Sequence, residues 1–578
     1  MTQWVSPTSS DANAPPRASA TTNQSPPGKP PGGGSATNKR AQKESSVKET
    51  IESILVAFIL AFIFRAFIVE AFVIPTGSMA PTLLGAHMRF TCTDCGYRFA
   101  ANYSDQSGSD EIRIPHTSPH TYRVFCPNCG FRLPQRDLDN PTNGSEKPPV
   151  HYGDRILVLK YLYLFEEPQR WDVVVFKSPY EPEKYHYQQN YIKRLIGRPN
   201  ESVLILDGDI YVGQPNQRPR EYTIQTKPRY VQDALWHVIY DNDFVPQKLW
   251  RDGSKWQQPW TVRTGTGWQI GDTPTREGRI FKFDNVGGES TVFFDPNVNQ
   301  ITPRGTLDAR PYAFTDWLAY DIETPGDPNV VHDLKLSFVY DRAAGDGPLR
   351  AKITRGGDGT DEFIAVLTPT EASLVHRSKG VERVIGKPMP LPADRNRRPL
   401  RVELTHVDYE AVLRVGDVEV ARTTPQDYRP DIAKLLNEFA LNVPQPLPTV
   451  EITAANQQAS LAHVGLWRDI YYINRPTPSL GGASLYWGTP IDIPKSIMQL
   501  GPDEYFVLGD NSLISGDARY WHEPIDLPAD GNLIVPAGRV PKRFMLGRAF
   551  FVYWPAGFRP AAMGPGLAPN FGDMRFIR

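Results

Sequence analysis

The feature that most constrains this 578-residue chain is an apolar segment near its N-terminus. The segment, IESILVAFILAFIFRAFIVEAFVI, runs from Ile51 to Ile74 and would extend about 36 Å as an α-helix, which is enough to cross a bilayer. Its uninterrupted apolar core, residues 54–64, is short, so we expect Arg65 and Glu70 to lie near the far interface, where the helix ends. A buried core helix or a cleaved signal peptide is the alternative, but the long preceding segment and the lack of a small-residue cleavage site disfavour a cleaved signal.

The residues before this segment indicate its orientation. Residues 1–47 are rich in Pro, Gly, Ser, Thr and Asn without apolar periodicity, so we expect a disordered tail. The distal part of this tail is basic, and basic flanks of membrane helices stay in the cytoplasm. The sequence therefore predicts a single-pass anchor over residues 48–70 in the cell membrane, with the N-terminus in the cytoplasm and the rest of the chain on the outer side.

Beyond the anchor, the chain has the features of a mainly β protein with several domains. Its 45 glycines and 55 prolines exceed average usage and indicate many loops and little helix. Short β-branched runs at Arg155–Leu159, Val173–Lys177 and Val203–Leu206 predict strands. The formal net charge of −1 argues against a large phosphate-binding surface, so no nucleic-acid partner is expected.

Residues 222–472 have the sequence pattern of a separate all-β insertion. Successive antiparallel strands are predicted at Asp333–Tyr340, Phe363–Leu367 and Arg401–Arg422, with a tight hairpin turn at Gly416 and Asp417. We therefore expect a β-sandwich of about 250 residues. It vaguely resembles concanavalin-like or laminin-G-like sandwiches, folds that often bind glycans or peptides, but no ligand site is evident in the sequence.

All four cysteines lie in two short motifs, CTDCG (Cys92–Gly96) and CPNCG (Cys126–Gly130). Two Cys-x-x-Cys-Gly turns can direct four thiolates to one tetrahedral metal ion, so residues 91–149 resemble a zinc ribbon with a structural zinc. Two disulfides are the alternative, because the outer side of the membrane is expected to be oxidising. His116 and His120 lie in the spacer, but four cysteines complete a site. The predicted zinc ligands are Cys92, Cys95, Cys126 and Cys129.

Three further motifs carry polar residues that could do chemistry, although each is a weak signal alone. A serine between Gly and Met usually lies in a turn, a lysine on a strand is usually solvated, and Gly-Asp-Asn is typical of a turn. Together, and in this order, these motifs and three strand-like segments resemble bacterial type I signal peptidases, also called leader peptidases. The resemblance rests on IPTGSMAPTL (Ile74–Leu83), YGDRILVLK (Tyr152–Lys160), WDVVVFKSP (Trp171–Pro179), YIKRLIGRPNE (Tyr191–Glu201), VLGDNSLISGDARYW (Val507–Trp521) and VPKRFMLGRAFFVYWP (Val540–Pro555).

The resemblance implies a serine–lysine mechanism without a catalytic cofactor. Ser78 would be the nucleophile and Lys193 the general base, which lysine can be only when burial lowers its pKa and leaves the amine neutral. The backbone N–H of Ser78 and the hydroxyl of Thr76, where many relatives have serine, would form the oxyanion hole. Ser515 would help to hold the lysine amine.

The resemblance also assigns supporting and substrate-binding residues. Asp517 and Arg519 would form a charge pair, and Asp510 and Asn511 would shape the turn that presents Ser515. The substrate pockets would accept small side chains at the −1 and −3 positions before the cut. Their expected lining residues are Ile74, Met79, Leu83, Ile192, Val174 and Phe176.

A catalytic β-domain in three parts follows from this reading. Its parts would be residues 71–90, 150–221 and 473–560, split by the two insertions and followed by a C-terminal tail over residues 561–578. The implied function is a membrane-bound serine endopeptidase that removes signal peptides from exported preproteins, with the bilayer and the translocation machinery as further partners. A membrane-tethered binding protein on an inactive peptidase scaffold and a serine–lysine protease of another fold are the alternatives; the complete set of Ser78, Lys193, Ser515 and Thr76 favours activity.

Overall fold

The structure is a computed structural model whose chain divides into two units, Met1–Phe64 and Arg65–Arg578. His116, His120 and most of the expected N-terminal tail lie outside the residues that it describes. The described residues are 38–63, 68–103, 124–133, 150–179, 189–247, 256–271, 275, 277–301, 312–321, 328–356, 360–391, 399–475, 485–527, 533–555 and 570–578.

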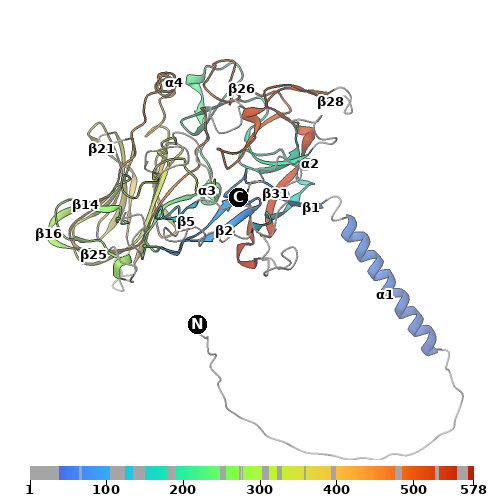
Figure 1. Cartoon of the computed structure of the whole chain (residues 1–578), viewed down its shortest axis with the longest axis horizontal. Coiled ribbons are helices and arrows are strands. Elements are labelled where there is room, and N and C mark those ends of the chain that lie inside the picture. The colour runs from blue at the N-terminus through green and yellow to red at the C-terminus, as the bar shows by residue number, and fades with distance from the viewer. Residues whose placement is uncertain are drawn as a thin grey trace, which may run out of the picture. The chain divides into compact units, whose positions relative to one another are not determined.

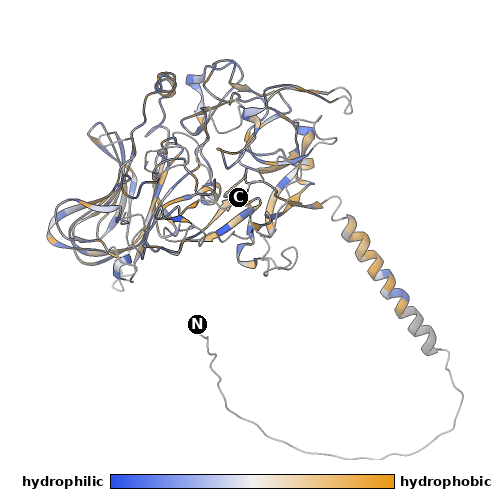
Figure 2. Cartoon of the chain, in the orientation of Figure 1, coloured by the Kyte–Doolittle hydropathy of each residue, from blue (hydrophilic) through white to orange (hydrophobic). Residues whose placement is uncertain are grey.

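The described part of the first unit is one helix, α1 (Asn38–Ile63). It begins earlier than the expected anchor and ends before Glu70, which instead lies in a strand and pairs with Lys160 over 3.1 Å. Figure 2 shows that hydrophobic residues follow one another along the C-terminal part of α1. Among the described residues, no helix combines the length and the apolar character that a membrane crossing requires.

The second unit is mainly β, as the sequence predicts, and its first layer is an eight-stranded antiparallel sheet (Figure 1). Segments from both ends of the chain build it, because the short β-branched runs of the N-terminal half pair with the long C-terminal strand β31. The strands in sheet order are β1 (Val69–Val73), β7 (Arg155–Leu159), β31 (Met545–Trp554), β8 (Val173–Lys177), β9 (Asn190–Gly197), β27 (Glu504–Leu508) and β30 (Val540–Pro541), and β32 (Arg575–Phe576) also pairs with β31.

A second, four-stranded sheet lies where the chain enters and leaves the stretch that forms the largest sheet. Its order is β12 (Thr223–Ile224), β11 (Asp209–Gly213), β10 (Ser202–Leu206) and β26 (Met498–Gln499). Because β12 and β26 flank residues 225–497, this whole stretch is inserted between two strands of one sheet. Two smaller elements complete this part, the helix α2 (Leu162–Phe165) and the strand pair β28 (Ile525–Leu527) and β29 (Leu533–Val535).

The inserted stretch forms one antiparallel sheet of thirteen strands around the 19-residue strand β25 (Val450–Arg468). Its long path is β21 (Val381–Pro390), β20 (Glu371–Ser378), β19 (Asp361–Leu367), β18 (Leu349–Arg355), β25, β17 (Leu334–Gly345), β22 (Leu400–Val407), β23 (Glu410–Val415) and β24 (Val418–Arg422). The remaining strands are β13 (His237–Asp241), β14 (Trp260–Thr264), β15 (Trp268–Gln269) and β16 (Phe281–Phe294). Helices α3 (Arg229–Leu235) and α4 (Ile432–Ala440) flank it, and Asp431 caps α4 by accepting a hydrogen bond from the Lys434 backbone N–H.

The cysteine-bearing segment forms two small sheets. The first consists of β3 (Arg98–Asn102), β2 (His87–Thr91) and β6 (Val150–His151), and the second of β4 (Val124–Phe125) and β5 (Arg132–Leu133). Their buried residues belong to the same apolar cluster as those of the thirteen-stranded sheet, which includes Met88, Phe131 and Phe294. The two insertions therefore share a core instead of forming separate modules.

Candidate active site

Ser78 lies in a tight turn that directly follows β1. The turn is closed by backbone hydrogen bonds from Ala80 N to Gly77 O (3.1 Å) and from Leu83 N to Met79 O (2.9 Å). The Asn511 N–H also donates to the Ser78 carbonyl oxygen over 3.1 Å. Ser78 is 8% exposed, so its hydroxyl is held in a fixed place at the edge of the interior.

Lys193 of β9 reaches this serine from the eight-stranded sheet. Its Nζ lies 3.0 Å from Ser78 Oγ and 3.1 Å from the Ile192 carbonyl oxygen. Burial lowers the pKa of Lys193 to about 8, while the carboxylates of Asp517 and Asp510 oppose this shift. Ser78 and Lys193, which lie 115 positions apart in sequence, are therefore within hydrogen-bond distance. The lowered pKa leaves about a tenth of the amine neutral at pH 7, far more than for a solvated lysine.

Asp510 forms a buried ion pair directly beside the turn that carries Ser78. Its carboxylate accepts from Arg194 Nε (2.6 Å) and Arg194 Nη2 (2.7 Å), and both side chains are fully buried. The Thr82 hydroxyl donates to the same carboxylate over 2.5 Å, and Arg194 Nη1 donates to the Trp171 carbonyl oxygen. This bidentate geometry ties the loop of Asp510 to both β9 and the chain after Ser78.

Asp517 and Arg519 form a second bidentate ion pair, also fully buried. Arg519 Nε and Nη2 each lie 2.8 Å from one Asp517 oxygen, and Asp517 also accepts from the Gly509 N–H over 3.0 Å. Arg519 donates further to the side chain and backbone of Ser512. The Ser515 hydroxyl is buried and has no hydrogen-bond partner among the described residues, Lys193 included.

The expected oxyanion-hole residue Thr76 lies in the same turn and is exposed to solvent. The six expected pocket residues separate into two groups. Ile74, Met79 and Leu83 are buried in one cluster, and Ile192 packs against it. Val174 and Phe176 are fully buried in another cluster. Side chains alternate between the two faces of a strand, and Val174 pairs in register with Lys193. Val174 and Phe176 therefore lie on the same face of the sheet as Lys193.

The comparisons with known proteins match parts of the chain that carry Ser78 and Lys193. A family model described as "Signal peptidase, peptidase S26" matches residues 47–100 and 140–281, which include Ser78 and Lys193. The chain is similar to signal peptidases. Signal peptidase I of Rickettsia bellii is 24% identical over 176 residues, 30% of this chain and 43% of the relative. Probable signal peptidase I-1 of Synechocystis sp. is 36% identical over 104 residues, 16% of this chain and 52% of the relative.

A plant relative has a different printed name. Thylakoidal processing peptidase 1 of Arabidopsis thaliana is 30% identical over 123 residues, 19% of this chain and 36% of the relative. The chain thus spans about half the length, or less, of these signal-peptidase relatives. A solved structure of the carbohydrate binding module CBM66 from Bacillus subtilis is 13% identical and covers 36% of this chain and 95% of that chain, at a TM-score of 0.22.

The four cysteines converge, and all are buried free thiols. Their Sγ atoms lie within 4.8 Å of one another, with 3.7 Å between Cys92 and Cys129 and 3.6 Å between Cys95 and Cys126. Each knuckle closes on a glycine with positive φ, Gly96 at 81° and Gly130 at 72°, a conformation that residues with a side chain rarely adopt. The cluster is therefore arranged as one four-thiol group and not as two disulfides.

Three buried carboxylates, those of Asp209, Asp333 and Asp408, also lie within 4.8 Å of one another. The ammonium group of Lys227 is buried in the same place and pairs with Asp408 and, over 2.9 Å, with Asp469. The Lys227 ammonium thus supplies positive charge beside the three carboxylates. We assign the cluster a structural role, because it connects β11 of the four-stranded sheet to the large insertion.

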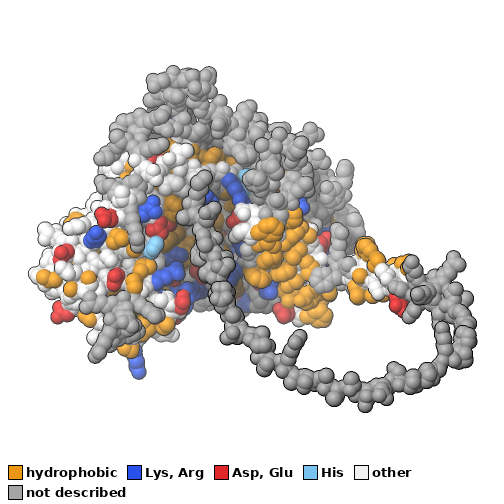
Figure 3. Space-filling view, turned by 90° about the horizontal axis from the view of Figure 1, so that it is seen from below, with side chains coloured by type: hydrophobic (Ala, Val, Ile, Leu, Met, Phe, Trp, Pro, Cys, Tyr) orange, Lys and Arg blue, Asp and Glu red, His pale blue; other side chains and the backbone are white. Residues whose placement is uncertain are grey.

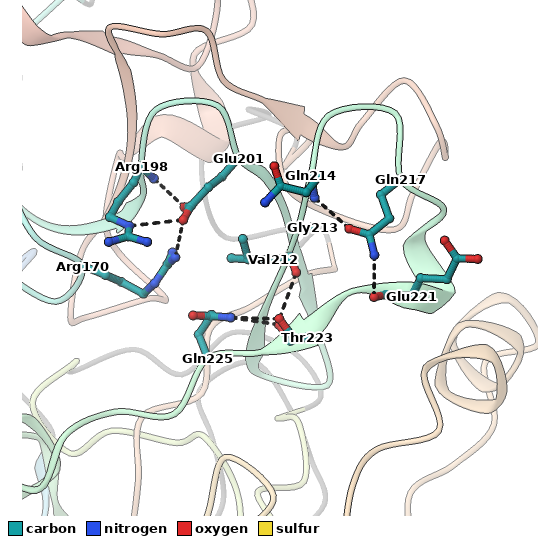
Figure 4. A pocket seen from close by; sticks show the side chains of 10 residues that line it. All are labelled: Arg170, Arg198, Glu201, Val212, Gly213, Gln214, Gln217, Glu221, Thr223 and Gln225. Atoms are coloured by element: carbon teal, nitrogen blue, oxygen red, sulfur yellow. Dashed lines mark hydrogen bonds and ion pairs between the residues drawn. The ribbon is translucent and has the colours of Figure 1, made fainter. Parts of the chain in front are cut away.

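A polar cavity of about 330 Å³ is lined in part by residues of β11 and β12 in the four-stranded sheet, and Ser78 is not among its lining residues (Figure 4). Its charged groups are satisfied internally, since Arg170 (2.7 Å) and Arg198 (3.2 Å) both pair with Glu201. The Gln217 side chain accepts from the Gln214 N–H and donates to a carbonyl oxygen. Both arginines of the lining are therefore neutralised by Glu201.

Three residues that hold the site together were not predicted from the sequence: Arg194, Thr82 and Asp154. Arg194 did have a detectable signal, because an arginine in an apolar strand requires a buried counter-ion. Asp154 accepts from the Leu84 N–H over 3.1 Å and pairs with Arg575 over 2.9 Å, which fixes the end of the nucleophile turn. Partners this distant in sequence leave no local pattern.

Proposed function

We propose that this protein is a membrane-bound signal peptidase, a serine endopeptidase that removes N-terminal signal peptides from exported preproteins. The observation that carries the proposal is the 3.0 Å separation between Ser78 Oγ and the buried Nζ of Lys193. A serine hydroxyl is a poor nucleophile without a base in hydrogen-bond reach, and a lysine with a pKa of about 8 can serve as that base near neutral pH.

In the proposed mechanism, the neutral Lys193 amine accepts the Ser78 proton as Oγ attacks the scissile carbonyl carbon. The oxyanion receives hydrogen bonds from the Ser78 N–H and from the Thr76 hydroxyl, which is exposed where a substrate would bind. The Lys193 ammonium then protonates the leaving amine, and the regenerated amine activates the water that hydrolyses the acyl-enzyme. Ser515, whose buried hydroxyl has no hydrogen-bond partner among the described residues, would orient the lysine once substrate is bound.

The proposed specificity is for small side chains at the −1 and −3 positions. Ile74, Met79 and Leu83 are packed to 3% exposure or less, which favours shallow depressions over deep pockets beside Ser78. Val174 and Phe176 lie on the face of Lys193 and would support the amine from below.

We further propose that the segment around α1 anchors the protein in the cell membrane, with the N-terminus in the cytoplasm and the catalytic unit outside, where translocation machinery delivers preproteins. Large apolar side chains of α1 are exposed, among them Phe58 (60%) and Phe62 (67%), and they require an apolar surrounding. The second unit also exposes apolar residues, including Leu164 (79%) and Phe165 (82%) of α2. Figure 3 shows apolar side chains gathered on one face of this unit.

A structural zinc at the four cysteines is part of the proposal. Four thiolates at a Zn–S distance of about 2.3 Å would lie about 3.8 Å apart at a regular tetrahedron's corners. The separations of 3.6 and 3.7 Å match this value and are far longer than a disulfide bond. The ion would supply folding energy to the ribbon and take no part in the reaction.

Cleavage of a preprotein with an Ala-x-Ala site tests the function. Detergent-solubilised wild type should cut after the second alanine, and both Ser78→Ala and Lys193→Ala should abolish cutting. Lys495→Ala is the matched control, because Lys495 is an exposed lysine with no link to Ser78. A folded wild-type protein that leaves a good preprotein intact would refute the proposal.

A further inference from the structure

A short segment of the large insertion, residues 317–321, reaches the turn that carries Ser78. Tyr320 packs directly on Gly77, the residue before Ser78. A Cβ atom at position 77 would lie 2.6 Å from Tyr320 Cε1 and 2.8 Å from its phenol oxygen, so only glycine leaves room for this ring. The phenol oxygen of Tyr320 is also buried, so the ring fills the space beside the turn that carries Ser78.

Asp321, the next residue, is linked to the turn through Asn511. Its Oδ1 accepts a hydrogen bond from Asn511 Nδ2 over 2.7 Å, and both side chains are buried. The backbone N–H of the same Asn511 donates to the Ser78 carbonyl oxygen. Two hydrogen bonds therefore connect the insertion to Ser78, one from Asn511 to Asp321 and one from Asn511 to Ser78.

The segment is itself fixed at both insertions. Arg468 of β25 donates to the Trp317 carbonyl oxygen over 2.9 Å, which connects it to the central strand of the large sheet. Asn102 of β3 donates its N–H to the Tyr320 carbonyl oxygen over 2.8 Å, and its Oδ1 also lies against Gly77. Gly77 is thus enclosed between the cysteine-bearing insertion and the large insertion, which meet at the nucleophile.

We propose that Tyr320 and Asp321 are positioning residues for Ser78, so that the large insertion is a working part of the catalytic centre instead of a separable binding module. This inference rests on the proposed function. Misplacement of a reacting atom by about 1 Å can cost about 100-fold in rate. Tyr320 restrains the turn directly at Gly77, and Asp321 restrains it through Asn511. Neither residue needs to touch the substrate for this effect.

The test uses the full chain and two measurements. Hydrogen exchange is followed in peptides that cover residues 74–84 and 507–515, and kcat and KM are measured with a preprotein peptide. Asp321→Ala and Tyr320→Leu should speed exchange in these peptides and lower kcat about 10- to 100-fold, with KM within about threefold. Asp321→Asn keeps an acceptor for Asn511 and should restore most of kcat. Asp417→Ala, at an exposed hairpin of the same insertion, should change nothing.

Normal exchange in both peptides and wild-type kcat in Asp321→Ala and Tyr320→Leu would overturn the inference and leave the proposed function standing. Lack of cleavage by the wild type would instead remove the proposed function, and the exchange measurement would still decide whether the insertion restrains the turn. If Asp321→Ala exchanges quickly over the whole chain, it has unfolded, and Tyr320→Leu decides by the same two outcomes.

Discussion

Lys193 determines the pH range in which the proposed reaction can run. Burial favours the neutral amine and gives a pKa of about 8, against the opposing influence of Asp517 and Asp510. Since the general base must be unprotonated, kcat/KM should rise about tenfold per pH unit below pH 8 and level off above it. The measurement is a pH profile with a peptide that does not titrate between pH 6 and 9.

A matched variant tests the cause of this profile. Asp517→Asn removes a negative charge that favours the lysine ammonium, so the rising limb should move to lower pH. A profile that is flat from pH 6 to 9 would contradict the role of Lys193 as base. A limb that moves to higher pH in Asp517→Asn would contradict the electrostatic assignment.

The buried Arg194–Asp510 pair is expected to matter for stability more than an exposed pair does. Asp510→Asn leaves an uncompensated guanidinium in the interior and should lower the free energy of unfolding by about 3 to 5 kcal/mol. Asp492→Asn, which breaks an exposed pair with Lys495, should cost less than about 1 kcal/mol. Denaturant titration measures the free energy of unfolding of both variants. Equal losses would show that burial does not make the Arg194–Asp510 pair more stabilising than the exposed pair.

At the residue scale, local motifs indicate candidate residues in the sequence, whereas partners from distant segments leave no such sign. Ser78 and Lys193 stand in short motifs, and the structure brings them within hydrogen-bond distance. Tyr320 and Asp321 stand in an unremarkable stretch of the insertion, and only the folded chain shows that they adjoin Gly77 and Asn511. Side chains alternate between the faces of a strand, so Val174, which pairs with Lys193, and Ile192 lie on opposite faces of the sheet. The sequence prediction placed both in one pocket because it did not take this alternation into account.

At the scale of elements, the cysteine ribbon gives the sharpest prediction. Wild-type protein should contain one zinc per chain by metal analysis, and Cys126→Ser should lose the zinc and lower the midpoint of thermal unfolding. Thr93→Ala is the control, because Thr93 is exposed in the same knuckle and offers no thiolate. Metal-free protein without titratable thiols in denaturant would instead favour two disulfides.

The strands were more predictable than their pairing. β-branched runs predicted β7, β8 and β10, and the Gly416–Asp417 turn predicted the hairpin of β23 and β24. The position of β31 between β7 and β8 was not predictable, because almost 400 residues separate these strands in sequence and no local pattern sets their register. The shared core of the two insertions was missed for the same reason, and separate modules were expected.

At the scale of the whole molecule, the division into two units predicts that peptide cleavage and membrane processing are separable. All described residues of the candidate site belong to the second unit, so a variant that begins at residue 68 should cleave a soluble signal peptide with kcat/KM within a few-fold of the full chain. The same variant should lose most of its activity on preproteins embedded in liposomes, because an anchor confines enzyme and substrate to one surface and raises their effective concentration. Parallel assays in solution and in liposomes measure both effects on the same preparation. Equal processing in liposomes by the two proteins would show that α1 is not what brings this enzyme to its substrates, and the exposed apolar residues of the second unit would then have to account for membrane binding.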